Sequence, residues 1–158
     1  MKRLMIGRTV ALSALCAAAV LATAFPAGAA ECPPEVKNAA KVSITLDFET
    51  GKMTVAPDPV TIYLTEGADR PGTVCWVVEN LGEKQTLHIE AKEGQPNLFP
   101  STTWMMTKTK DWADSGKPTA AGSWKYQLWI TEEGHSGKLF PTDPEIIING
   151  TGGERGGG

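Results

Sequence analysis

GTVCWVVENLGEKQTLHIE, residues Gly72 to Glu90, is the stretch that decides the fold class. Apolar residues recur at every second position in both of its halves, which is typical of β-strands that bury one face. The residues of that face, including one just after the stretch, are Val74, Trp76, Val78, Leu87, Ile89 and Ala91. Residues 79–84 are typical of a turn, so we predict a strand pair at the centre of a β domain. His88, one of two histidines in the chain, lies on the second strand.

More strands are predicted before this pair. Residues 41–56 alternate apolar and polar side chains around a tight turn, which predicts a hairpin. Pro57 and Pro59 interrupt central pairing after it, so we expect the strand at residues 60–64 to lie at an edge or to switch between sheets. Short strands separated by Gly and Pro, without a long helix, favour an antiparallel sandwich or barrel.

The second half of the chain alternates less regularly. The strands predicted there are at residues 102–108, 124–131 and 145–149. The connection at residues 93–121 is unusually long for a compact domain, so it is either functional or contains an element that the pattern does not reveal. Residues 131–144 are predicted to be a loop that carries His135.

Both ends of the chain are predicted to lie outside the domain. Residues 1–30 combine a basic start, an apolar run and the small residues Ala27-Gly28-Ala29, which is the pattern of an export signal peptide. No later stretch approaches the roughly 20 apolar residues of a transmembrane helix. Residues 150–158 are mostly glycine and are predicted to be disordered. We therefore predict one domain, residues 31–149, in a periplasmic or secreted protein.

The charge of the predicted mature chain limits its partners. Residues 1–30 contain three basic and no acidic residues, so their removal changes the formal net charge from −3 to −6. An acidic domain argues against nucleic acid and anionic membrane surfaces as partners, because both attract a basic face.

Two cysteines remain after the predicted signal, Cys32 and Cys75. An even number in an oxidising compartment predicts a structural disulfide, which would tie the N-terminal arm to the sheet. The alternative is a pair of free thiols that bind a metal, although the two lack the close CxxC spacing of such sites.

Segments along residues 41–149 together resemble the cupredoxin superfamily. In chain order they are APDPVTIYLTEG, GTVCWVVEN, TLHIE, GSWKYQLWI, the Gly-His-Ser-Gly loop at residues 134–137, and PEIII. The resemblance implies a cupredoxin-like antiparallel Greek-key β-sandwich. In blue copper proteins of that family, copper is held by a histidine after the third strand and by a cysteine, a histidine and usually a methionine around the last loop. His88 and His135 match the places of the two histidines.

The cysteine of that family is missing here. Leu128 stands at its position, no cysteine follows Cys75, and no methionine follows His135. The thiolate gives a type 1 site its strong Cu(II) bond and its redox tuning. The sequence therefore predicts against blue-copper electron transfer, because a fold can be shared without its site.

Four residues are candidate metal ligands: His88, His135, Met105 and Met106. Thioether sulfur suits Cu(I), imidazole also binds copper, and the Trp104 indole can lie against a cation, so these residues would make a thiolate-free copper site. Each candidate has a structural alternative. A lone histidine on a strand is more often a hydrogen-bonded surface residue, and adjacent methionines on a strand point to opposite sides, one into the core.

The sequence predicts a binding module and not an enzyme. No nucleophile and base have the spacing of a catalytic triad, and no Gly-rich phosphate loop leads from a strand into a helix. Two functions remain open. One is copper binding by His88 with Met105, Met106 or His135; the other is a metal-free sandwich that binds a periplasmic protein or a small ligand through its long connection and exposed aromatics.

Overall fold

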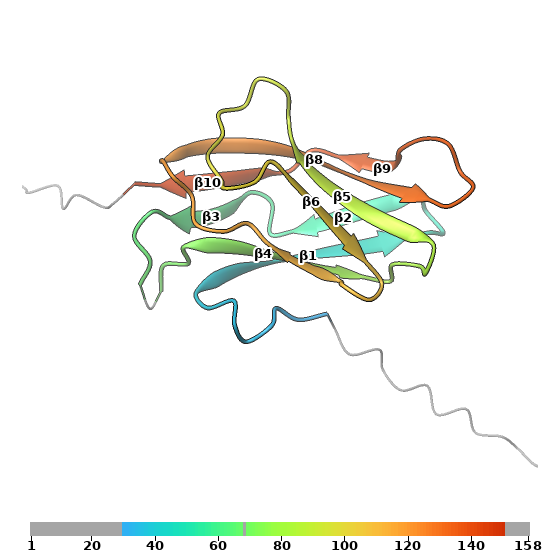
Figure 1. Ribbon diagram of the computed structural model, residues 1–158, viewed down its shortest axis with the longest axis horizontal. Helices are drawn as coiled ribbons and strands as arrows, with labels where there is room; N and C mark the ends of the chain where they lie inside the picture. The colour runs from blue at the N-terminus through green and yellow to red at the C-terminus, as the bar shows by residue number, and fades with distance from the viewer. Residues whose placement is uncertain (1–29, 68, 151–158) are drawn as a thin grey trace, which may run out of the picture.

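The computed structural model describes residues 30–67 and 69–150, which form two facing β-sheets (Figure 1). The predicted all-β sandwich is confirmed. Sheet A has the order β2-β1-β4-β7, with β1 at Ala39–Asp47, β2 at Lys52–Ala56, β4 at Thr73–Glu79 and β7 at Trp112–Asp114. Sheet B has the order β3-β10-β8-β5-β6, with β9 paired to β8; its strands are β3 at Val60–Tyr63, β5 at Gln85–Ala91, β6 at Thr103–Thr107, β8 at Gly122–Glu132, β9 at Leu139–Thr142 and β10 at Glu145–Asn149. The predicted signal peptide, apart from Ala30, and the predicted tail, apart from Gly150, lie outside the described residues.

Both sheets are mixed, whereas the sequence predicted antiparallel pairing throughout. β1 pairs with β4 in parallel and β3 pairs with β10 in parallel, while the other pairs of named strands are antiparallel. The path of the chain explains this, because the chain leaves sheet A after β2, forms β3 in sheet B and returns with β4 beside β1. Pro57 and Pro59 lie at this change of sheet, as predicted, since neither can donate a ladder hydrogen bond.

The two strands predicted at residues 72–90 do not pair with each other, so the prediction of their pairing is wrong. Both strands form, but β4 pairs with β1 and β7 in sheet A, and β5 pairs with β6 and β8 in sheet B. The turn between them carries the chain from one sheet to the other, with Asn80 in the left-handed region (φ 67°) and Leu81 buried. Alternation identifies the buried side of each strand but not its hydrogen-bonded neighbour, so it does not distinguish a hairpin from a link between two sheets.

The long connection at residues 93–121 contains two strands. β6 confirms the strand predicted at residues 102–108, but β7 was not predicted, and neither was β9 inside the predicted loop at 131–144. β7 has three residues and β9 has four, which is too short for a period of two to stand out. The connection therefore places one edge strand on each sheet.

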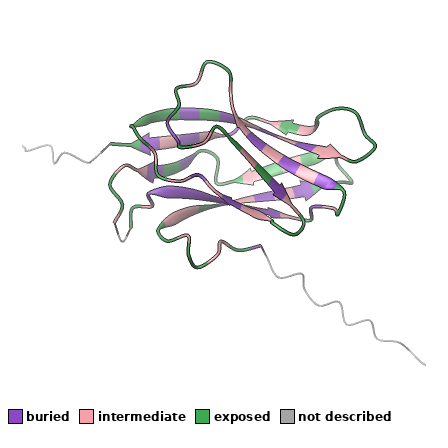
Figure 2. Ribbon diagram, viewed as in Figure 1, coloured by how far each residue is buried: buried purple, intermediate pink, exposed green. Residues whose placement is uncertain are grey.

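Aromatic side chains fill much of the space between the sheets, and Figure 2 shows the buried positions alternating with exposed or intermediate ones along β8. This aromatic cluster comprises Trp76, Phe99, Trp104, Trp124 and Tyr126. The Trp76 Nε1–H donates to the Tyr126 hydroxyl at 3.2 Å, which joins the two sheets across the core. Because alternate side chains of β5, β6 and β8 pack into this core, the side chains between them face outward.

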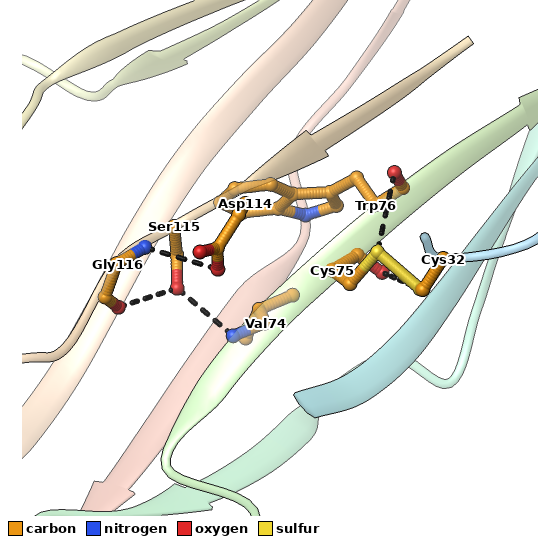
Figure 3. The surroundings of a disulfide bond; sticks show 7 residues. All are labelled: Cys32, Val74, Cys75, Trp76, Asp114, Ser115 and Gly116. Atoms are coloured by element: carbon orange, nitrogen blue, oxygen red, sulfur yellow. Dashed lines mark hydrogen bonds between the residues drawn. A yellow bond between two sulfur atoms is a disulfide. The ribbon is translucent and has the colours of Figure 1, made fainter. Parts of the chain in front are cut away.

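The N-terminal arm, residues 30–38, covers the outer face of sheet A. The predicted Cys32–Cys75 disulfide is present and links the arm to β4, with the two Cα atoms 6.2 Å apart (Figure 3). Cys75 and Val77 are fully buried under the arm, and Trp112 packs against them. β4 is therefore buried on both faces, unlike β5, whose outward residues are only partly covered.

Candidate functional site

The candidate site lies on the outer face of sheet B, where β8, β5 and β6 are neighbours. The strand registers align outward side chains in rows across the three strands. The central row is Trp129, His88 and Met105, and the flanking rows are Thr131, Thr86 and Thr107 on one side and Gln127, Glu90 and Thr103 on the other. The central row places an imidazole between an indole and a thioether.

The pairing of β5 with β6 brings His88 and Met105 close together. The Ala91 N–H donates to the Thr102 carbonyl at 2.9 Å, so these two residues form a hydrogen-bonded pair. The two kinds of pair alternate along antiparallel strands, and His88 with Met105, an odd number of positions away in the same register, is therefore a non-hydrogen-bonded pair. Such pairs have Cα atoms about 4.5 Å apart and side chains at their closest. The imidazole and the thioether are therefore cross-strand neighbours on the outer face of sheet B.

His88 is oriented by β8. Its Nε2 atom lies 2.8 Å from Thr131 Oγ1, and its ring stacks on Trp129 with centroids 5.2 Å apart and planes 4° from parallel. Lys138, which precedes β9 on the other side of β8, places Nζ 3.7 Å from the centroid of the Trp129 ring. Contacts with two residues of β8 thus orient the His88 imidazole, and the Lys138 ammonium packs over the Trp129 indole.

The charge state of His88 suits a ligand. Burial lowers the pKa of His88, the Glu90 carboxylate opposes this shift, and the Lys138 ammonium adds to it. The net effect favours the neutral imidazole, which is the form that coordinates a metal.

A hollow of 310 Å³ opens to solvent over the central row. Its lining residues are His88, Ile89, Glu90, Thr103, Trp104, Met105 and Trp129. Gln127 Nε2 donates to Glu90 Oε2 at 3.2 Å, so the carboxylate at the rim is held in place. The hollow thus combines one aromatic wall, one soft sulfur donor and a fixed carboxylate.

The four predicted ligands fall in three different places. His88 and Met105 meet in the hollow, where Met105 is 63% exposed. Met106 points the other way from β6 and is fully buried in the core, so it does not reach the face that carries His88. His135 is exposed in the turn after β8, where its N–H donates to the Glu132 carbonyl at 3.0 Å. Trp104 also packs inward, with its ring centroid 5.1 Å from that of Trp76.

Five residues with side-chain contacts in or around the hollow were not predicted as site residues: Glu90, Gln127, Trp129, Thr131 and Lys138. In the alternating pattern of residues 124–131, Trp129 falls among the polar positions. A large aromatic side chain on the polar side of a strand was the sign in the sequence that could have identified this residue. Among residues 30–67 and 69–150, no group of three or more His, Cys, Asp or Glu side chains is placed to hold a metal ion. The Met105 sulfur is the soft donor that lines the hollow together with His88.

Comparisons with protein-family models and with curated proteins gave no match. In the part of the chain that the structure describes, no helix has the length and apolar character needed to span a bilayer.

Proposed function

We propose that this protein is an exported binding module, not an enzyme, and that it binds Cu(I) through His88 and Met105. The observation that carries the proposal is their non-hydrogen-bonded pairing on an accessible face of sheet B. Thioether sulfur selects Cu(I), and imidazole is a second suitable donor. The stacked Trp129 indole covers one side of the imidazole and limits its contact with water.

The contact between His88 and Thr131 favours one nitrogen as the ligand. Nε2 is engaged by Thr131 Oγ1, which leaves Nδ1 as the nitrogen available to a metal. An ion held by Nδ1 and the Met105 sulfur would keep an open side, because Met105 is exposed. An open side suits a protein that passes copper to a periplasmic partner, since the partner can supply the next ligand.

The resemblance to cupredoxins is consistent with this role but not with a blue copper site. Leu128, at the position of the family's cysteine, is fully buried in the core and has no donor atom. The proposed site lies instead on the outer face of the sheet, and it needs no thiolate.

Competition with a Cu(I) chelator tests the proposal. We expect the wild type to compete, and we expect His88→Ala and Met105→Leu each to weaken Cu(I) binding by about tenfold or more, because each removes one of two protein ligands. Met106→Leu is the matched control, since it changes the neighbouring methionine on the buried side and should leave affinity unchanged. A wild type that does not compete, or a Met105→Leu variant with wild-type affinity, would contradict the proposal.

A second candidate is a metal-free site for a small polar ligand or a protein partner in the same hollow. The observation that favours it is the indole wall beside the Glu90 and Gln127 side chains, because ligand sites commonly combine an aromatic surface with a few fixed polar groups. Glu90→Gln separates the two functions. It should weaken the binding of a polar ligand, while it leaves both proposed Cu(I) ligands in place.

A further inference from the structure

Met105 and Met106 are neighbours in sequence with opposite environments. Met105 is 63% exposed and Met106 is fully buried, because successive residues of β6 face opposite sides of sheet B. β6 is the edge strand of that sheet, so Met105 has a neighbouring strand on one side only. Met105 lines both the 310 Å³ hollow beside His88 and a second hollow of 440 Å³ toward β7. A small solute can therefore approach Met105 from two sides.

We propose that Met105 is a reversible oxidation site that switches the hollow from a soft to a hard donor set. The oxidant is hydrogen peroxide. A sulfur lone pair attacks one peroxide oxygen, the O–O bond breaks, the S–O bond of the sulfoxide forms, and water leaves after proton transfer. Sulfur loses two electrons and the peroxide gains them. A methionine sulfoxide reductase reverses the step.

The selectivity of this oxidation follows from burial. A sulfoxide is polar, so forming it at Met106 would place an unpaired acceptor in the core, whereas at Met105 it would face water and the His88 ring. Met53 is only partly exposed on β2 and provides a third environment for comparison.

The consequence for binding rests on the proposed copper function. Oxidation uses one of the two lone pairs of the thioether sulfur, makes that sulfur electron-poor and adds an oxygen acceptor, which is a harder donor than the thioether. Imidazole alone would then remain of the two proposed ligands. The hollow would release Cu(I) under oxidising conditions and recover its affinity after reduction.

Hydrogen peroxide treatment of the intact protein, followed by peptide mass mapping, tests the site. We expect Met105 to gain one oxygen while Met106 stays unmodified and the circular dichroism spectrum stays unchanged. Met106→Leu should be oxidised at the wild-type rate, and Met105→Leu should lose the rapid phase. Oxidation of Met106 at the same rate as Met105, or an unmodified Met105, would overturn the proposal.

Chelator competition before oxidation, after oxidation and after reductase treatment tests the switch. Loss of Cu(I) binding on oxidation and its return after reduction support it. Selective oxidation of a protein that never bound Cu(I) would leave the oxidation site standing and overturn the copper function. Undiminished Cu(I) affinity of the Met105 sulfoxide would overturn the switch while the copper function survives.

Discussion

At the residue scale, His88 links the site to the pH dependence of stability. Burial lowers the pKa of His88 from 6.5, with Lys138 acting in the same direction and Glu90 against it. The unfolded chain therefore binds a proton at a higher pH than the folded chain does, so acid favours unfolding through this group. We expect the unfolding free energy of the wild type, relative to His88→Gln, to be constant above pH 6.5 and to fall as the pH is lowered through 6.5. Urea denaturation at a series of pH values measures it, and a difference that rises toward acid pH would refute the assignment.

The sequence pattern predicted part of the arrangement around His88 and not the rest. The alternation around His88 placed it on the side of its strand opposite to Leu87 and Ile89, and the structural alternative for Met105 and Met106, one methionine inside and one outside, is the arrangement found. The row that joins His88 to Met105 and Trp129 was not predictable, because it depends on the registers of three strands that are distant in sequence.

At the scale of elements, Ser115 fastens the short strand β7 to β4. Its Oγ accepts a hydrogen bond from the buried Val74 N–H at 2.9 Å and donates to the Gly116 carbonyl at 2.8 Å (Figure 3). Ser115→Ala leaves the Val74 N–H without that acceptor, so we expect a loss of about 1–3 kcal/mol in unfolding free energy. Ser101→Ala is the control, because Ser101 bonds the Thr103 backbone on an exposed edge and should change stability by less than about 0.5 kcal/mol. Equal effects of the two substitutions in chemical denaturation would argue against this role.

Some strands were predicted from the sequence and others were not. The strands with clear alternation, β1, β5 and β8, were predicted, whereas β7 and β9 were too short to show a period. The pairing of β4 with β5 was predicted wrongly because a short turn suggested a hairpin. Leu81 is buried in that turn, and an apolar residue among polar neighbours was the one sign that the turn crosses between layers.

At the scale of the whole molecule, the arm and the two sheets form one structure with unequal outer faces. The arm closes the outer face of sheet A over Cys75 and Val77, while the outer face of sheet B keeps the hollow around His88. The sequence predicted one domain between the two ends of the chain, but the mixed sheet order depends on long-range contacts that alternation does not encode. The two outer faces of the sandwich therefore differ, because the arm covers Cys75 and Val77 on sheet A while Met105 stays exposed on sheet B.

The Cys32–Cys75 disulfide is what ties the arm to this structure. It joins residues 43 positions apart, and closing a loop of that length in the unfolded chain is worth about 3 to 4 kcal/mol in the chain-entropy model. We expect Cys32→Ala to lower the unfolding free energy by about that amount, and Cys75→Ala to lower it further because Cys75 is fully buried and leaves a cavity. Alkylation of the native protein without reductant checks the bond first, and two reactive thiols would contradict it. If the bond is intact but Cys32→Ala unfolds at the wild-type denaturant midpoint, the arm does not contribute to global stability through this cross-link.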